Sequence, residues 1–178
     1  MSSQKPNSDR SHTIAVLVDN EPGVLARVIG LFAGRGYNIE SLTVSEVDAV
    51  KGYSRITIVT SGTDMVIEQI KALLDRLVPV HMVEDLTVQG PCLERELALV
   101  KVVNAGESRI EALRIADMFR ARAIDSTLNS FVFELTGSPK KLNAFIELMS
   151  GLGKTEITRG GVVAIARGSG IGLQNNKT

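Results

Sequence analysis

The sequence predicts an α+β protein built from two consecutive βαββαβ units. Short apolar runs typical of strands alternate with segments in which apolar residues recur every three or four positions, as in helices. The order of elements before residue 90 repeats after it. Gly90 and Pro91 interrupt the chain between the two halves, and this dipeptide predicts the boundary there.

The first strand and helix follow from their local patterns. Residues 13–18 are apolar apart from Thr13 and predict a buried strand. Asn20 is expected to cap the next helix, with Pro22 in its first turn, and Gly34 and Gly36 are expected to end it. The apolar face of this helix is formed by Val24, Val28, Leu31 and Phe32.

The other elements follow in the same way. In the first unit we expect strands at 38–46, 54–60 and 80–88, and a helix capped by Thr63 or Asp64. In the second unit we expect strands at 94–103, 123–128, 130–136 and 155–167, the last one bulged at Gly160-Gly161, and helices capped by Ser108 and opened by Ser138-Pro139. Two such units match the split-βαβ, ferredoxin-like pattern.

The predicted domains are residues 11–90 and 91–168. Residues 1–10 form a polar tail that is expected to be disordered, and 169–178 form a flexible one. Several strands, such as 15–18 and 162–165, are apolar at every position. Either a second chain covers the other face of the sheet, or these strands are central and well buried.

Composition excludes several classes of protein. The 20 basic and 20 acidic residues cancel, which argues against binding to nucleic acid or to a membrane surface. One cysteine, Cys92, cannot form an intramolecular disulfide, and His12 and His81 are too few and too far apart for an ordinary zinc site. With no membrane-spanning run and no signal-peptide core, the expected location is the cytoplasm, or an organelle if a transit segment is missing.

No catalytic motif is present: GxSxG, HExxH, CxxC and P-loop patterns are all missing. Residues 151–155, GLGKT, resemble the end of a phosphate loop, but they follow a helix and lack the first glycine, so they are interpreted as a helix stop. We therefore expect no catalytic residue, no metal site and no cofactor site in this chain.

The strongest local pattern lies between the first strand and the first helix, in Asn20-Glu21-Pro22-Gly23-Val24-Leu25. A helix N-terminus has free N–H groups and a partial positive charge, which suit a carboxylate. Gly23 would allow a ligand close to the backbone, and Asn20 offers an amide donor and acceptor. A helix start that binds nothing explains the same residues, so both interpretations stay open at this point.

Residues 14–44 read IAVLVDNEPGVLARVIGLFAGRGYNIESLTV and resemble an ACT domain, an amino-acid-sensing module. More narrowly, the chain resembles the regulatory (small) subunit of acetohydroxyacid synthase, also called acetolactate synthase. The similarity extends through 54–58, 94–97 and 159–164 and spans about residues 11–168. The main local departure is the segment 45–53.

The resemblance implies a non-catalytic subunit that activates a large catalytic partner and confers feedback inhibition by valine, or another branched-chain amino acid, in branched-chain amino-acid biosynthesis. Thiamine diphosphate, Mg²⁺ and FAD would belong to that partner. ACT domains of this kind pair side by side as homodimers. Asn20, Glu21, Pro22, Gly23, Val24 and Leu25 of one chain would then meet Asn38 and Ile39 of the other around the effector.

Three other classes compete with this interpretation. A free-standing ACT-type amino-acid sensor would keep the first loop, but it would not need the matching second half. An RNA-binding ferredoxin-like domain would need exposed aromatic residues on its central strands, and strands 13–18 and 54–60 have none. A small enzyme on this fold would need paired carboxylates or histidines at a loop, which this sequence lacks.

Overall fold

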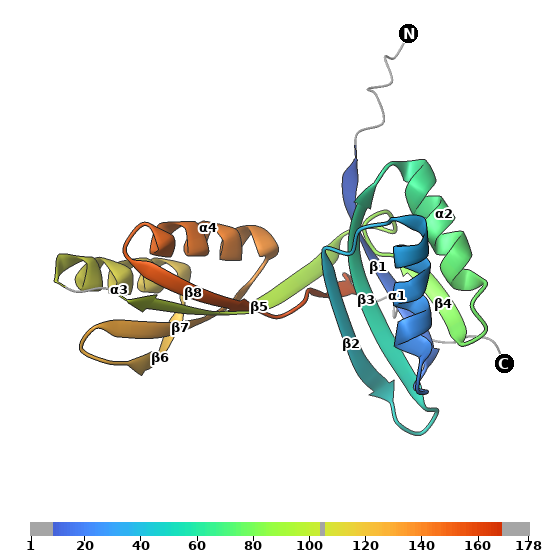
Figure 1. Cartoon of the computed structure of the whole chain (residues 1–178), viewed down its shortest axis with the longest axis horizontal. Coiled ribbons are helices and arrows are strands. Elements are labelled where there is room, and N and C mark those ends of the chain that lie inside the picture. Colours follow the sequence, from blue (N-terminus) through green and yellow to red (C-terminus); the bar gives the residue numbers. More distant parts are fainter. Residues whose placement is uncertain (1–8, 104–105, 169–178) are drawn as a thin grey trace, which may run out of the picture. The chain divides into compact units, whose positions relative to one another are not determined.

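The computed structural model describes residues 9–103 and 106–168 (Figure 1). Both units have the predicted βαββαβ order, which confirms the fold class. The first unit contains β1 (Arg10–Asp19), α1 (Val24–Arg35), β2 (Ser41–Asp48), β3 (Tyr53–Gly62), α2 (Asp64–Asp75) and β4 (Val80–Asp85). The second contains β5 (Cys92–Val103), α3 (Glu107–Phe119), β6 (Arg122–Ser126), β7 (Ser130–Gly137), α4 (Pro139–Ser150) and β8 (Lys154–Arg159), and β9 (Val163–Ala166) follows.

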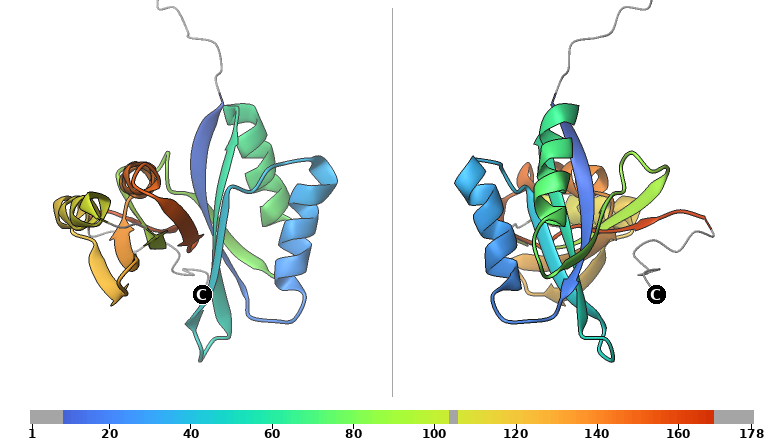
Figure 2. Two further views of the ribbon diagram at one scale, coloured as in Figure 1. Left: turned by 60° about the vertical axis from the view of Figure 1, so that its left-hand side comes forward. Right: turned by 90° about the vertical axis from the view of Figure 1, so that its right-hand side faces the viewer.

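The first sheet has the order β2-β3-β1-β4, and every neighbouring pair is antiparallel. Helices α1 and α2 lie on one face of this sheet (Figure 2). The apolar helix faces predicted from the sequence supply the core on that side: Val24, Val28 and Phe32 of α1 are buried against Ile14, Val16 and Ile58. Thr63 caps α2 as predicted, its hydroxyl accepting a hydrogen bond from the Val66 N–H.

The opposite face of β1 is also buried, and the chain covers it with its own later segments. Ala15 packs with Leu86 and with Ala164 of β9, and Cys92 lies against this cluster. The Arg55 guanidinium donates to the Ala164 carbonyl at 2.7 Å, and burial lowers the pKa of Arg55 while the charge of Glu84 raises it. The cover over Ala15 therefore comes from this chain, where the sequence left a second chain and a simple central strand as alternatives.

These contacts change the predicted division of the chain. The compact units consist of the residues up to Leu93 together with those from Ala164 onward, and of Glu94–Val163. The expected single strand at 155–167 is broken: β8 ends at Arg159, the Gly160 N–H donates to the Leu97 carbonyl, and β9 begins at Val163. Residues 160–162 thus separate two strands, where a bulge within one strand was expected, and β9 belongs to the first unit from Ala164 on.

The predicted tails were residues 1–10 and 169–178. Residues 1–8 and 169–178 lie outside the described residues, and Arg10 already belongs to β1.

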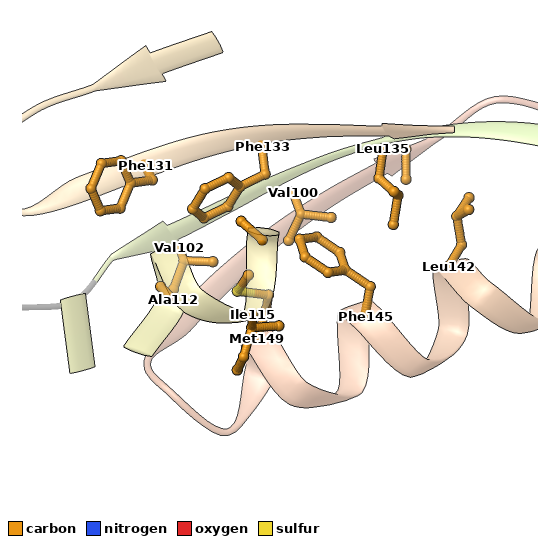
Figure 3. Packing of buried hydrophobic residues seen from close by; sticks show 12 residues of the cluster. Val100, Val102, Ala112, Ile115, Phe131, Phe133, Leu135, Leu142, Phe145 and Met149 are labelled. Carbon is orange, nitrogen blue, oxygen red and sulfur yellow. The ribbon is translucent and has the colours of Figure 1, made fainter. Parts of the chain in front are cut away.

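The second sheet has the antiparallel order β6-β7-β5-β8, and β9 pairs with β5 outside this path. Its core is rich in phenylalanine: Figure 3 shows Phe133 and Phe145 facing one another between the sheet and α4. Ser138 caps α4 as predicted. Ser108 does not cap α3, because Gly106 takes the N-cap position with φ 64° and places Ser108 inside the first turn.

An ion pair with a buried carboxylate joins β5 and β8 at the end of this sheet. Glu96 is only 7% exposed, and both of its carboxylate oxygens accept from Arg159, at 2.7 and 2.6 Å. Arg159 also donates to Asn143 of α4 at 2.7 Å. The hydrogen bonds to Glu96 raise the pKa of Arg159 above its usual value, although burial lowers it. This cluster ties β5, β8 and α4 together.

We expect Glu96→Ala to destabilise the chain by about 2 kcal/mol, because it removes two charge-assisted hydrogen bonds and leaves a partly buried guanidinium. Glu156→Ala is the matched control in the same sheet: Glu156 is exposed and pairs with Lys101 at 3.9 Å, so the expected loss is below about 0.5 kcal/mol. Urea unfolding of both variants measures the difference. Equal losses in the two variants would show that the Glu96 pair adds no stability of its own.

Candidate functional site

The segment predicted to bind a ligand, residues 20–23, leaves the end of β1 and enters α1. Two backbone hydrogen bonds hold its start. The Asp19 N–H donates to the Pro79 carbonyl at 2.9 Å, and the Asn20 N–H donates to the Gly52 carbonyl at 2.7 Å. Since β1 is one of the two central strands of its sheet and is buried, the core of the first unit sets the position of this segment.

Helix α1 has no side-chain cap. Its N-cap residue is Gly23, in the left-handed conformation with φ 87°, and no side chain accepts from the first turn. The prediction that Asn20 caps the helix is therefore wrong, and Pro22 lies before the N-cap rather than inside the helix. The cause is Gly23, which turns the chain into the helix after Pro22, in a conformation that a side chain rarely adopts.

The space beside this helix start is open. A Cβ atom built on Gly23 would meet no atom within 4 Å, and the first turn of α1 contains no acidic residue. Asn20, Glu21, Pro22 and Leu25 are exposed, whereas the side chain of Val24 is buried in the core. Of Val24, therefore, only the backbone N–H could contact a ligand, and it donates to the Glu21 carbonyl across 3.4 Å. The partial positive charge at the start of α1 and the open space at Gly23 suit a carboxylate.

The side chain of Asn20 is held by a residue that the sequence did not single out. Its Nδ2 donates to the Glu46 carboxylate at 3.1 Å. Glu46 lies in β2 beside an irregularity in the pairing with β3, and Gly52 turns the chain into β3 with φ 67°. Both belong to the segment 45–53, where the sequence alone indicates the main local departure from the family. Gly52 and Asp48 are local signals for a tight turn there, and the Asp48 carboxylate accepts from the N–H groups of Val50 and Lys51. No signal pointed to Glu46.

Asn38 and Ile39 lie at the other end of α1. Gly36 ends the helix with φ 70°, as predicted, and its N–H donates to the Ala33 carbonyl at 3.3 Å. The Asn38 carbonyl then accepts from the Thr60 hydroxyl at 2.6 Å, while Asn38 itself is exposed and Ile39 packs partly into the core. A helix of 12 residues is about 18 Å long. The chain alone therefore does not bring the two predicted halves of the site together.

Within residues 9–103 and 106–168, no group of three or more His, Cys, Asp or Glu residues is arranged to hold a metal ion. No helix in that part of the chain is long and apolar enough to cross a bilayer.

Family comparisons match both units. Residues 14–82 match the ACT domain of acetohydroxyacid synthase small subunits, and residues 95–168 match the small subunit of acetolactate synthase. The chain is 47% identical to a probable acetolactate synthase small subunit from Archaeoglobus fulgidus over 158 residues, which cover 89% of this chain and 98% of that one. It is 45% identical to the isozyme 3 small subunit from Escherichia coli over 159 residues, covering 89% and 96%.

A solved structure agrees with these sequence matches. The acetolactate synthase small subunit from Thermotoga maritima superimposes with a TM-score of 0.81 at 38% identity, covering 90% of this chain and 99% of that one. The matches run through both units and nearly the full length of the relatives, with the open helix start of α1 inside the matched ACT domain. The chain belongs to the family of acetolactate synthase small subunits.

Proposed function

We propose that this chain is a non-catalytic regulatory subunit that activates the catalytic subunit of acetolactate synthase and confers feedback inhibition by valine or another branched-chain amino acid. Membership of the small-subunit family implies the catalytic partner. Thiamine diphosphate, Mg²⁺ and FAD would be held by that partner, and both proteins would act in the cytoplasm. The observation that carries the effector part of the proposal is the uncapped, open N-terminus of α1 at Gly23.

The chemistry of an amino acid matches this helix start. The carboxylate of the effector would accept from the N–H groups at Gly23 and Val24, where the partial charge of the helix is positive; without a ligand the Val24 N–H donates to the Glu21 carbonyl across 3.4 Å. The ammonium would donate to the side chain of Asn38 and to main-chain carbonyls. Leu25, which is 38% exposed, and Ile39 would receive the branched side chain.

A homodimer would bring these groups together. Strand β2 is an outer strand of the sheet and pairs only with β3 among the described residues, so its other edge is open to a second copy. Val44 on β2 and Leu25 and Ile29 on α1 are exposed apolar side chains. A two-fold axis beside β2 would set the start of one α1 near the end of the other, because a symmetric pair places each patch against its counterpart. Each dimer would then hold two composite sites.

A free-standing amino-acid sensor is the alternative. It would share the first unit, but it would have no need of a second unit of this type. The small-subunit match over residues 95–168 favours the subunit.

The first test reconstitutes the chain with a catalytic subunit of the family and measures acetolactate formation with and without valine. We expect activation by the wild-type chain and inhibition by valine. Gly23→Asp should keep the activation but weaken valine inhibition about 100-fold, because a carboxylate and a side chain would stand where the effector carboxylate binds.

Gly106→Asp is the matched control, since Gly106 is the N-cap of α3, also has a positive φ of 64° and also faces open space. It should leave valine inhibition unchanged. A wild-type chain that gives no activation would contradict the subunit function, and normal valine inhibition of Gly23→Asp would show that the site is elsewhere.

The second test asks whether the site is shared between two chains. Gly23→Asp and Asn38→Ala should each reduce valine binding, the latter about 10- to 100-fold through the lost hydrogen bond to the ammonium. In a mixed dimer of the two variants, one site would contain both substitutions and the other would contain none. Calorimetry should therefore detect one site per mixed dimer that binds valine with wild-type affinity. If both halves of the site came from the same chain, mixing would recover no high-affinity binding.

A further inference from the structure

A histidine–aspartate pair lies at the end of β1, where the loop of residues 20–23 that precedes α1 begins. The His81 Nε2 and an Asp19 carboxylate oxygen are 2.6 Å apart. An ionised carboxylate only accepts, so Nε2 carries the donated hydrogen. The ring of Tyr53 lies against the imidazole of His81, with ring centroids 4.6 Å apart. Asp19 pairs with Tyr53 across β1 and β3, so the cluster joins the ends of β1, β3 and β4.

A β-bulge places His81 in this position. Leu17 pairs with Met82 and Val18 pairs with Val80, so His81 is an extra residue in β4 between two regular pairs. The corresponding pairing of β5 with β8 in the second unit runs without a shift from Ala98 to Val103. Bulges re-aim side chains at the edges of sheets. Here the bulge points an imidazole at the last residue of β1, which immediately precedes Asn20.

Among the described residues, the base of the loop has four attachments. Two are backbone hydrogen bonds, from the Asp19 N–H to the Pro79 carbonyl and from the Asn20 N–H to the Gly52 carbonyl. The other two are made by side chains: Asn20 donates to Glu46, and His81 pairs with Asp19, whose carboxylate is partly exposed. Loss of the His81 contact would leave the fold of the sheet in place while removing the side-chain restraint on Asp19, the residue from which residues 20–23 start.

We propose that His81 is a positioning residue for the effector loop, residues 20–23: by holding Asp19 it fixes the backbone of residues 20–24 in the conformation that presents the uncapped start of α1 to a ligand. The proposal rests on the proposed function for its link to effector affinity, but the effect on the loop does not require an effector. His81 acts through Asp19 and does not itself contact the effector.

The same strand provides a matched control. His12, near the start of β1, forms a similar pair with Asp85, with Nδ1 and the carboxylate oxygen 2.7 Å apart. It is seven residues from Asp19, about 23 Å along the strand. Loss of either imidazole breaks a His–Asp pair on β1, but only the loss of His81 affects the base of the loop.

The experiment compares the wild-type chain with His81→Ala, His81→Gln and His12→Ala. Amide hydrogen exchange of the free chain reports on residues 20–24, and calorimetric titration with valine reports on affinity. We expect His81→Ala to speed exchange in this segment and to weaken valine binding about tenfold, the worth of one hydrogen bond to a charged group that is partly exposed. Glutamine retains an amide donor for Asp19 and should restore both properties. His12→Ala should lower thermal stability without affecting either.

Unchanged exchange of residues 20–24 in His81→Ala would overturn the proposal, and so would an equal effect of His12→Ala. Faster exchange with unchanged valine affinity would overturn the link to the effector. If the wild-type chain bound no branched-chain amino acid while exchange responded as expected, the proposed effector function would fail and the positioning role of His81 would be supported.

Discussion

Strand β1 is buried on both faces, and the arrangement of the first unit depends on that constraint. On one side it carries Ile14, Val16 and Val18 into the core beneath α1 and α2. On the other side Ala15 is fully buried by Leu86 and by Ala164 from the far end of the chain. A strand in a split-βαβ sheet normally has water on one face. Here the small side chain of Ala15 lets another segment approach closely, and Arg55 holds that segment through its main chain.

The proposed effector site lies where this buried strand ends. An Asn, Ser or Asp cap would stabilise α1 by about 1 kcal/mol, but it would also occupy the N–H groups of the first turn. The chain instead enters α1 through a left-handed glycine and uses Asn20 to hold Glu46. The helix therefore has no side-chain cap, and no side chain occupies the N–H groups of its first turn. The helix is stabilised by the packing of its buried side chains Val24, Val28 and Phe32 against the core, and this packing does not need a cap.

Periodicity was sufficient to predict the order of elements, the fold class and most of the buried residues. The helix faces and the caps of α2 and α4 depend on neighbours within four positions, and such signals are local. The wrong prediction of the α1 cap has a local cause, the left-handed conformation of Gly23. The features that the sequence left open or did not indicate have non-local causes: the double burial of β1 depends on Ala164, and the partner of Asn20 lies beside an irregularity in the pairing of β2. The loop was found through glycine chemistry and family resemblance, whereas Glu46 and His81 acquire their positions only from strand pairing.

The path of the chain makes the second unit an insertion in the first. The chain leaves the first unit at Leu93 and returns at Ala164, where β9 pairs with β5 and the Arg167 N–H donates to the Pro91 carbonyl. After a single proteolytic cut within residues 94–163, each of the two fragments would still contain a part of the first unit, and the two would stay together through it. Truncation near residue 90 would remove more than a domain, because it would strip Ala164 from Ala15 and leave Arg55 without its carbonyl. To isolate the first unit intact, residue 93 must be joined to residue 164 by a short linker, so that β9 stays in place.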